Sequence, residues 1–537
     1  MILDNLTQAA VPSVDSTFDD LFRAAAARHP QAIALADPPD RSRVTDGAPR
    51  RLTYAEADRM ISAIAVRLRR TGLQPDAVVG LQMANTVDGV LAFLGILRAE
   101  LIAMPVPLLW RRADAVAAIR RAGASALVVS GRIGATDYFD LAINAAAEAF
   151  TVRQVCGFGP RAPDGAISLE DLYTAAEVAP AGTLDERSAG SGRGAHVAAL
   201  TWDVTADGPV PVARSHAQLI AGGLAVLLES GIPQEATILS PLAPWSFAGI
   251  ALTLVPWLMV GGKLVLHHPF DSTTLAAQLQ EEDCGTMILP GPLVSPLKAA
   301  GLLSAPHSPR AIVAAWRAPE QLRRAADWQD PAVSLTDVQL FGEIGLIAAR
   351  RSTNRRPAPI PLGSVVAPRA AQEALQVAEV AISPGGTLTL SGPMVATAAF
   401  PPGAERTELP CHRPTAEGFV DTRYAADLCR GGSAVLARGL PPDLISFGGY
   451  RFAVGELRDT VNCLDPSATL AVRPDKLVGH RLTGTAANPE AICAALRNIG
   501  ANPLLVEAFG EPCKDRPGQI AGLAEIEEAM ENQRLTA

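Results

Sequence analysis

Apolar residues recur along the chain in two alternating patterns. Over 18–28 and 53–69 they recur at helical spacing, which predicts two amphipathic helices. Over 78–82 and 126–130 they form short uninterrupted runs, which predict buried strands. Between these runs the pattern predicts a helix at 87–101, a strand at 102–107 and a helix at 113–122. Strands that alternate with helices of this length are typical of a parallel sheet covered by helices.

A second strand–helix series follows the stretch 177–195, whose Ala, Gly, Ser and Pro content predicts an exposed connector. Its strands are expected near 237–242, 263–267 and 286–289. After Arg350 the pattern changes to short strands and turns, at 378–382, 387–391 and 418–421. From 444 onward the chain shows a small separate pattern of helices and strands.

These patterns predict an α/β fold with two domains. The large N-terminal domain, 1–440, is expected to hold two helix-covered, mainly parallel sheets and a β-rich subdomain. Its subdomains are expected at about 1–190, 191–345 and 346–440. A hinge at 441–443 is expected to join it to a small mobile α+β domain at 444–537.

Composition and charge narrow the function classes. The chain has 537 residues and a net charge of −9, which argues against a nucleic-acid partner. It has no run of ~18 apolar residues, so we expect no membrane span. The sequence after Met1 lacks the basic and apolar regions of a signal peptide, which favours a cytoplasmic location. Seven dispersed cysteines without C-x-x-C spacing indicate reduced thiols. Nothing in the pattern indicates an oligomeric state.

Several strings, taken in order, resemble one superfamily. They are LTYAEAD at 52–58, a strand–helix–strand string at 80–106, TLTLSGPMV at 387–395 and GGYRF at 448–452. Their order and spacing are similar to the adenylate-forming (AMP-binding) superfamily of acyl-CoA synthetases, luciferases and nonribosomal-peptide adenylation domains. The resemblance covers almost the whole chain. It implies activation of a carboxylate with ATP and Mg²⁺ to an acyl-adenylate, followed by transfer to coenzyme A or an acyl carrier protein.

The superfamily's phosphate loop is a Ser/Thr/Gly-rich run that ends in Pro-Lys-Gly, shortly before a Ser-His pair. Ser215 and His216 set the register, so the loop aligns with 201–212. The aligned positions are Val210 for the lysine, Pro211 for the glycine after it, Val204 and Asp207 for loop glycines, and Asp203 for a serine, with Thr205 among them. Valine removes the cation, the second proline removes a backbone donor, and two aspartates repel a polyphosphate. The alternative is a wrong register, with the other glycine-rich stretch, 190–194, as the loop.

The motifs for magnesium and ribose also depart from the superfamily. The aromatic-Gly-x-Thr-Glu motif aligns with Phe341 and the two residues after it. Glu343 is the magnesium ligand only if two residues are deleted before it, and is otherwise a solvent-facing glutamate at a strand end. The Thr-Gly-Asp motif aligns with 422–424, which read Thr-Arg-Tyr. Asp421 lies beside it, but its side chain should point to the opposite face of a strand.

The hinge and the small domain differ as well. The hinge motif Gly-Arg-x-x-Asp keeps its aspartate as Asp443 and lacks its arginine. Gln519 stands where the superfamily has its catalytic lysine, and Lys514 could replace that lysine only in a rearranged loop.

The resemblance also implies an acyl pocket. Trp316 and Arg317 stand in the place of two glycines of a Gly-Gly-Ala-Pro turn, so two large side chains would occupy the pocket. Trp245 and Phe247 stand where the superfamily often has an aromatic-His turn, which favours an apolar or aromatic ligand. The alternative is that Trp245, Phe247 and Trp316 are core residues.

Two interpretations of function remain. The first is a non-catalytic or strongly altered member with a degenerate ATP site, which binds an acyl ligand, a carrier protein or a partner enzyme. The second is an active AMP-forming acid–thiol ligase that uses ATP, Mg²⁺ and coenzyme A with an unusual site, built from Arg214, Glu343 and Lys514. The coordinated motif losses favour the first, because losing even one preorganised charge costs ~3 kcal/mol in such sites. A hydrolase lacks support, since no G-x-S-x-G string occurs.

Overall fold

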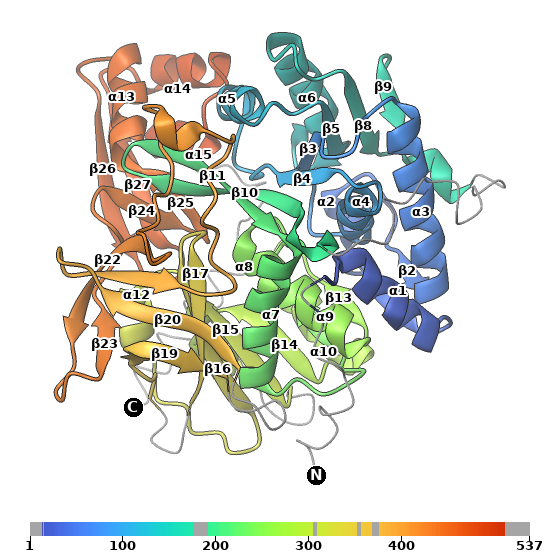
Figure 1. The fold of residues 1–537 in the computed structure, drawn as a ribbon. Helices are drawn as coiled ribbons and strands as arrows, with labels where there is room; N and C mark the ends of the chain where they lie inside the picture. The colour runs from blue at the N-terminus through green and yellow to red at the C-terminus, as the bar shows by residue number, and fades with distance from the viewer. Residues whose placement is uncertain are drawn as a thin grey trace.

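Two large sheets flanked by helices make up most of the protein (Figure 1). The computed structural model describes residues 13, 15–174, 192–303, 309–351, 356–367 and 375–510. The fold is α/β with mixed parallel and antiparallel sheets, as the alternation of helices and strands predicts. The predicted connector at 177–195 lies mostly outside the described residues.

The first large sheet has seven strands and ends in an antiparallel hairpin. Its order is β11 (Gly208–Ser215), β10 (Val197–Thr205), β4 (Ile102–Pro105), β3 (Val78–Gln82), β5 (Ala126–Ser130), β8 (Gln154–Phe158) and β9 (Ala166–Ser168). Neighbouring strands from β10 to β9 are parallel. β11 is therefore an edge strand, and it carries the hairpin that aligns with the phosphate loop.

The second large sheet has eight strands, parallel in its centre and antiparallel at both ends. Its order is β17 (Gly345–Arg350), β16 (Ser334–Phe341), β15 (Ala311–Trp316), β14 (Thr286–Pro290), β12 (Ile238–Ser240), β13 (Leu264–Leu266), β1 (Ile33–Ala36) and β2 (Arg51–Thr53). The β16–β17 turn contains Gly342 and Glu343, so the predicted magnesium ligand, Glu343, lies at this edge of the sheet.

The helices lie on and between the two sheets. They are α1 (Phe18–Arg28), α2 (Arg41–Val44), α3 (Tyr54–Arg70), α4 (Val87–Arg98), α5 (Arg112–Ala122), α6 (Tyr138–Glu148), α7 (His216–Ser230), α8 (Phe247–Gly249), a π-helical turn (Ile250–Leu254), α9 (Val255–Val260), α10 (Ser272–Glu282), α11 (Val294–Ala299) and α12 (Pro319–Arg323). Side-chain caps define the starts of several of them, including α1, α3 and α7. At α7, Ser215 accepts from the Gln218 N–H while Gln218 accepts from the Ser215 N–H, so the Ser-His pair forms a capping box.

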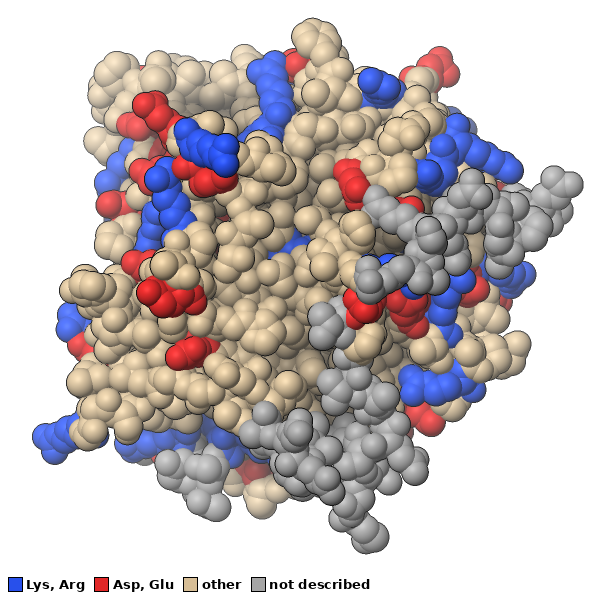
Figure 2. Space-filling view, viewed as in Figure 1, with Lys and Arg blue, Asp and Glu red and all other residues tan. Residues whose placement is uncertain are grey.

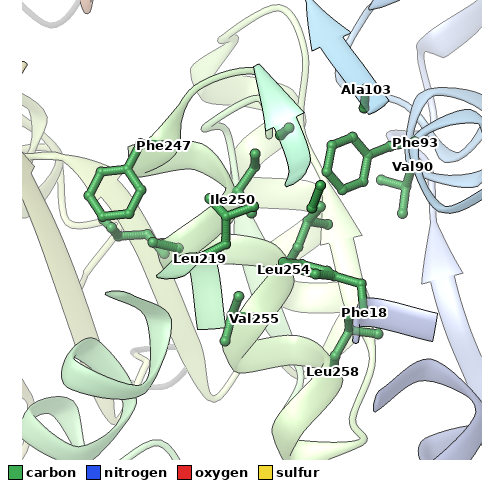
Figure 3. Close-up of a cluster of buried hydrophobic side chains, with 14 of the residues drawn as sticks. Phe18, Val90, Phe93, Ala103, Leu219, Phe247, Ile250, Leu254, Val255 and Leu258 are labelled. Carbon is green, nitrogen blue, oxygen red and sulfur yellow. The ribbon is translucent and has the colours of Figure 1, made fainter. Parts of the chain in front are cut away.

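The core between the sheets is built from helices that are apolar on most of their surface. Every residue of α4 is buried, and Figure 3 shows its Val90 and Phe93 in one cluster with Phe18, Ile250 and Leu254. Burying one such side chain typically contributes about 1.5–3 kcal/mol. Phe247 belongs to the same cluster, so the core extends to the candidate site.

Two smaller sheets follow, both antiparallel. The six-stranded sheet runs β18 (Ile360–Pro361), β23 (Ala434–Ala437), β22 (Val420–Leu428), β21 (Thr387–Ser391), β20 (Gln376–Ile382) and β19 (Gly363–Val366). The four-stranded sheet runs β25 (Tyr450–Ala453), β24 (Leu444–Phe447), β27 (Gly479–Thr485) and β26 (Thr469–Asp475), with α13 (Val454–Leu464), α14 (Pro489–Asn498) and α15 (Pro503–Phe509). A short pair, β6 (Arg132–Ile133) and β7 (Thr136–Asp137), precedes α6. The C-terminal elements lie beside the β10–β11 hairpin and α5 (Figure 1).

The surface is uneven in charge. Figure 2 shows Lys, Arg, Asp and Glu side chains mainly toward the margins of this face, with uncharged residues over most of its centre. Among the described residues, no helix is both long enough and apolar enough to span a membrane.

Candidate functional site

The stretch that aligns with the phosphate loop is a regular β-hairpin. Cα partners run from Thr201 and Val212 through Asp203 and Val210 to Thr205 and Gly208, which leaves a two-residue turn, Ala206–Asp207. Thr205 closes the turn, since its Oγ1 donates to the Gly208 carbonyl at 3.1 Å and accepts from the Asp207 N–H at 3.2 Å. Backbone groups that pair in a ladder are not available to a phosphate. Proline is tolerated because β11 is an edge strand.

Both faces of the hairpin are packed. Val210, in the place of the loop lysine, is 1% exposed and clusters with Val212 and Ala396. On the other strand, Val204 clusters with Leu444 and Ala453 of the four-stranded sheet. The hairpin therefore acts as a packing element that joins the large sheet to the C-terminal elements.

A buried charge cluster lies beneath the hairpin, formed by Asp203, Arg451 and His412 and called here the Asp203 cluster. Arg451 Nη1 is 2.8 Å from Asp203 Oδ1, and His412 Nε2 is 3.1 Å from Asp203 Oδ2. The side chains of Asp203, Arg451 and His412 are 4%, 7% and 11% exposed. Burial acts to raise the pKa of Asp203, but Arg451 and His412 hold it well below its usual range. Arg451 lies on β25, so the cluster ties β10 to the C-terminal elements.

Gly342 makes the cluster possible. It has φ +60, and a Cβ at this position would clash with Arg451 Nη1 and with the Asp203 carboxylate. The glycine of the Phe-Gly-Glu string is therefore needed to admit a guanidinium, because any side chain would fill that space.

Tyr424 fills the position that aligns with the ribose-binding aspartate. It is fully buried, its hydroxyl donates to the Arg317 carbonyl at 3.2 Å, and its ring meets Phe341 edge to face at 5.2 Å. Arg451 lies over the ring at 5.7 Å. Burial raises the pKa of Tyr424, so a neutral ring occupies the place of a carboxylate.

Arg423 has an unusual backbone conformation. It aligns with the glycine of Thr-Gly-Asp and has φ +63, a conformation that L side chains rarely adopt. The neighbouring alternation also follows the prediction, since Thr422 is buried and Asp421 is exposed on the opposite face. Asp421 accepts from Thr387 Oγ1 at 2.9 Å.

Glu343 is buried, so the interpretation of a solvent-facing glutamate is wrong. It is 3% exposed, and its Oε2 accepts from the Phe247 N–H at 2.7 Å. Burial raises its pKa, while Arg317 and Arg214 act to lower it. Arg214 is fully buried, donates to the carbonyls of Glu343 and Ile344, and stacks on the Phe247 ring at 4.1 Å. Burial lowers the pKa of Arg214 to about 10. The Glu343 carboxylate is thus engaged inside the protein, and its assignment as a magnesium ligand stays a prediction.

The predicted acyl-pocket residues separate into two groups. Arg317 lies at the site, where its Nη2 donates to Ser246 Oγ at 3.1 Å, and Phe247 lies beneath Arg214. Trp316 belongs to a separate core cluster, and its Nε1 donates to Asp337 Oδ1 at 2.8 Å. Trp245 packs on Gly89 and Phe93 of α4.

His216 and Asp443 serve local structure. His216 is 8% exposed, and its Nδ1 accepts from the Phe18 N–H at 3.3 Å. Burial lowers its pKa to about 4. Asp443 has φ +61 in the predicted hinge, and its carbonyl accepts from the Val454 N–H at 2.9 Å. Lys514 and Gln519 lie outside the described residues.

A cavity of about 350 Å³ opens beside the hairpin turn. It is lined by Asp207, Glu408, Leu409, Pro410, Cys411, His412, Arg413, Val420, Asp421 and Arg423. Asp207 and Asp421, two predicted nucleotide positions, therefore lie at one hollow. His412 lines the same hollow and contacts Asp203 of the Asp203 cluster. We call this hollow the turn cavity.

Sequence reasoning identified the altered positions but missed what replaces them. It named Asp203 and the string that contains Arg451, and it did not pair them, because they lie 248 residues apart. His412 was not considered. The sequence offered little signal, because β10 is buried along most of its length without alternation and nothing marks Asp203 as paired. Only the rule that a buried carboxylate needs a cation could have prompted the search for one.

Comparison with known proteins agrees with the fold. The model of the family described as AMP-binding enzyme matches residues 22–198. The structure resembles the amide bond synthetase McbA from Marinactinospora thermotolerans, with 17% identity, a TM-score of 0.64, and coverage of 91% of this chain and 94% of that one. It also resembles ATP-bound MatB from Rhodopseudomonas palustris, with 16% identity, a TM-score of 0.57 and 94% coverage of both chains. NpsA-ThdA, an artificially fused adenylation–PCP di-domain from Klebsiella oxytoca, gives 16% identity, a TM-score of 0.63, and coverage of 91% and 92%.

Among curated proteins, the chain is similar to a beauvericin nonribosomal cyclodepsipeptide synthetase from Beauveria bassiana. The two are 34% identical over 92 residues, which is 17% of this chain and 3% of the synthetase. The chain therefore spans only a small part of such relatives.

Proposed function

We propose that the chain is a non-catalytic member of the adenylate-forming superfamily whose nucleotide site has become a structural joint, a contact that holds the C-terminal elements on the seven-stranded sheet. In this proposal it binds an acyl ligand, a carrier protein or a partner enzyme, and does not form acyl-adenylates. The observation that carries the proposal is the ion pair between Asp203 and Arg451, which occupies the position aligned with the phosphate loop.

ATP fits this arrangement poorly. The hairpin backbone from Thr201 to Val212 is paired in register, so it offers no row of free N–H donors to phosphates. The guanidinium that lies beneath the hairpin, that of Arg451, already neutralises Asp203. A triphosphate brought to this place would have to separate that buried pair, and an unpaired buried charge is strongly destabilising.

The ribose and magnesium positions fit equally poorly. Tyr424 offers a buried hydroxyl that is bonded to a carbonyl, where the ribose hydroxyls would need a carboxylate. Glu343 is bonded to a backbone N–H inside the protein. Among the described residues, no group of three or more His, Cys, Asp or Glu side chains is placed to hold a metal ion. We therefore derive no chemical step through ATP, Mg²⁺ or coenzyme A.

A binding role is supported by what remains. The apolar core around α4 and α7 is closely packed and extends to the altered site, and the turn cavity is large enough for a small ligand. A carrier-protein partner is a natural candidate within this proposal, because an adenylation–PCP fusion is among the structural relatives.

Calorimetry with ATP·Mg²⁺ tests the proposal. We expect no heat of binding at millimolar ATP from protein that melts cooperatively, and clear binding by MatB from Rhodopseudomonas palustris under the same conditions. Micromolar binding by this chain, or acid-dependent pyrophosphate release across a panel of carboxylic acids with coenzyme A, would establish the alternative. That alternative is an active AMP-forming acid–thiol ligase with Arg214, Glu343 and Lys514 in its site.

A further inference from the structure

The turn cavity contains charges that have no use in the joint described above. Arg413 and Arg423 line it, and neither forms an ion pair with a carboxylate among the described residues. Asp207 and Glu408 line it as well, and neither forms an ion pair with a cation in the part of the chain that the structure describes. A third carboxylate of the wall, Asp421, accepts from Thr387 Oγ1 and from the Arg423 N–H. Two guanidinium groups and two carboxylates without such partners thus share the wall of one hollow with it.

The arrangement of the wall separates it from ordinary surface. The cavity is bounded by the hairpin turn and, far later in the sequence, by the loop 408–413 and the nearby start of β22. Arg121 holds two of them together, because its guanidinium donates to the carbonyls of Pro209 and Pro410. Arg423, which lines the cavity, has φ +63. A strained backbone held in a fixed wall is characteristic of functional sites.

From these features we infer that the turn cavity binds a small zwitterionic ligand, whose anionic group meets Arg413 and Arg423 and whose cationic group meets Asp207 and Glu408. Guanidinium groups bind carboxylates and phosphates by paired N–H donors, and carboxylates accept from an ammonium group. The volume of about 350 Å³ admits a small molecule. This inference rests on the proposed binding function and names a ligand class and a place for it.

His412 connects this cavity to the Asp203 cluster. It lines the cavity, and its Nε2 is 3.1 Å from Asp203 Oδ2. A ligand in the cavity therefore lies one side chain away from the pair that fixes β25 on β10. Ligand binding should therefore alter the packing of the C-terminal elements on β10, through the contact between His412 and Asp203.

Cys411 supplies a local probe of occupancy. Its thiol lines the cavity and is half-buried, whereas Cys463 is exposed on α13 and does not line the cavity. The rate of alkylation at each cysteine, measured by peptide mass spectrometry, therefore reports on the cavity with an internal reference. Protection of Cys411 without protection of Cys463 identifies binding at this place.

The experiment uses three probes with the same four-carbon chain: γ-aminobutyrate, succinate and putrescine. They carry one charge of each sign, two negative charges and two positive charges, respectively. We expect γ-aminobutyrate to protect Cys411 at the lowest concentration. Stronger protection by succinate or putrescine overturns the zwitterion assignment, and no protection by any probe overturns the site.

Variants assign the contacts. Arg423→Gln and Asp207→Asn should each raise the γ-aminobutyrate concentration for half-protection by roughly tenfold or more, since each removes a charged partner. Asn is well suited to a turn, and Gln keeps an L side chain at the same φ. Arg430→Gln, an exposed arginine that does not line the cavity, is the matched control and should leave protection unchanged. Equal effects of the three substitutions contradict the inference.

The result separates this inference from the proposed function. Failure of all probes in protein that also fails to bind ATP·Mg²⁺ removes the zwitterion site and leaves the non-catalytic proposal standing. ATP·Mg²⁺ binding removes the proposed function, whichever probe protects Cys411.

Discussion

Residues 22–198 match the model of the family described as AMP-binding enzyme, whereas the match ends where the β10–β11 hairpin begins. The AMP-binding match covers the first region and stops at residue 198, the second residue of β10. In the first region, apolar helices and parallel strands build a continuous core. In the second, a buried cluster of Asp203, His412 and Arg451 stands where the alignment places a phosphate loop.

The difference shows that the fold and a nucleotide site depend on different features of the sequence. The fold needs apolar surface to be buried at the right spacing, and many sequences meet that need. A nucleotide site needs particular charges and free backbone donors at a few positions, and a handful of substitutions removes them. The hairpin is paired in register and packed by apolar residues, although its sequence differs from the superfamily's phosphate loop.

The strongest test of the joint is removal of its cation. Arg451→Met should lower the free energy of unfolding by about 3–5 kcal/mol, because Asp203 would remain buried without its guanidinium. Chemical denaturation followed by circular dichroism measures the loss. Limited proteolysis should also cut the C-terminal elements faster, since Arg451 ties β25 to β10.

Two controls identify the cause of that loss. Adding Asp203→Asn to Arg451→Met should recover part of the stability, because the unpaired charge is then gone. Arg438→Met breaks the exposed pair with Asp427, whose side chains are 63% and 47% exposed, and should change the stability far less than Arg451→Met does. A loss no larger for Arg451→Met than for Arg438→Met would show that the cluster is not a joint.

A second test concerns the hydrogen bond between α1 and α7, in which His216 Nδ1 accepts from the Phe18 N–H. His216 has a pKa lowered by burial from 6.5 to about 4. Between these values the unfolded chain binds a proton that the folded chain does not, so stability rises with pH in this window. His216 should contribute about 3 kcal/mol of this rise, and His216→Gln should remove that contribution while keeping an acceptor for Phe18. Urea unfolding at pH 4.5 and 7.5 measures it, and an unchanged difference in the variant contradicts the assignment.

A third test fills the space beside the Asp203 cluster with a methyl group and leaves the charged side chains of the cluster unchanged. Gly342→Ala should cost about 2 kcal/mol, because the new methyl group displaces Arg451 from Asp203 and φ is +60. Gly386→Ala is the control, since Gly386 has φ +79 and nothing lies within 4 Å of its added Cβ. The control should show only the backbone cost, about 1 kcal/mol. Thermal unfolding of the two variants distinguishes the contributions, and equal losses would mean that Gly342 does not border the cluster.

Much of the fold could be predicted because it depends on local pattern. The strands expected at 78–82, 126–130 and 387–391 and the helix at 18–28 have those bounds in the structure. The helix expected at 87–101 ends instead at Arg98, because its apolar run continues into the connection to β4. Apolar spacing predicts that an element exists better than where it ends.

The site resisted prediction because its contacts are distant in sequence. Aligning 201–212 with a loop left no reason to expect a hairpin in which Asp203 is buried. Nothing local to Asp203 indicates which of the chain's many arginines reaches it. The solvent-facing alternative for Glu343 is wrong for a similar reason: the partner of this carboxylate, the Phe247 N–H, is 96 residues away. The predicted domain boundaries and site assignments stay predictions.

The smallest expected effect concerns Arg423, where the backbone of the motif persists without its glycine. Arg423→Gly should stabilise the protein by about 0.5–1 kcal/mol, because glycine adopts φ +63 without steric cost. Arg430→Gly, at an exposed position without positive φ, should instead be neutral or destabilising. If Arg423→Gly is stabilising and also abolishes protection of Cys411 by γ-aminobutyrate, the strain at this position serves the ligand. A destabilising Arg423→Gly would mean that the side chain holds the wall of the cavity, and the likeness of this turn to the superfamily motif would then be limited to its backbone.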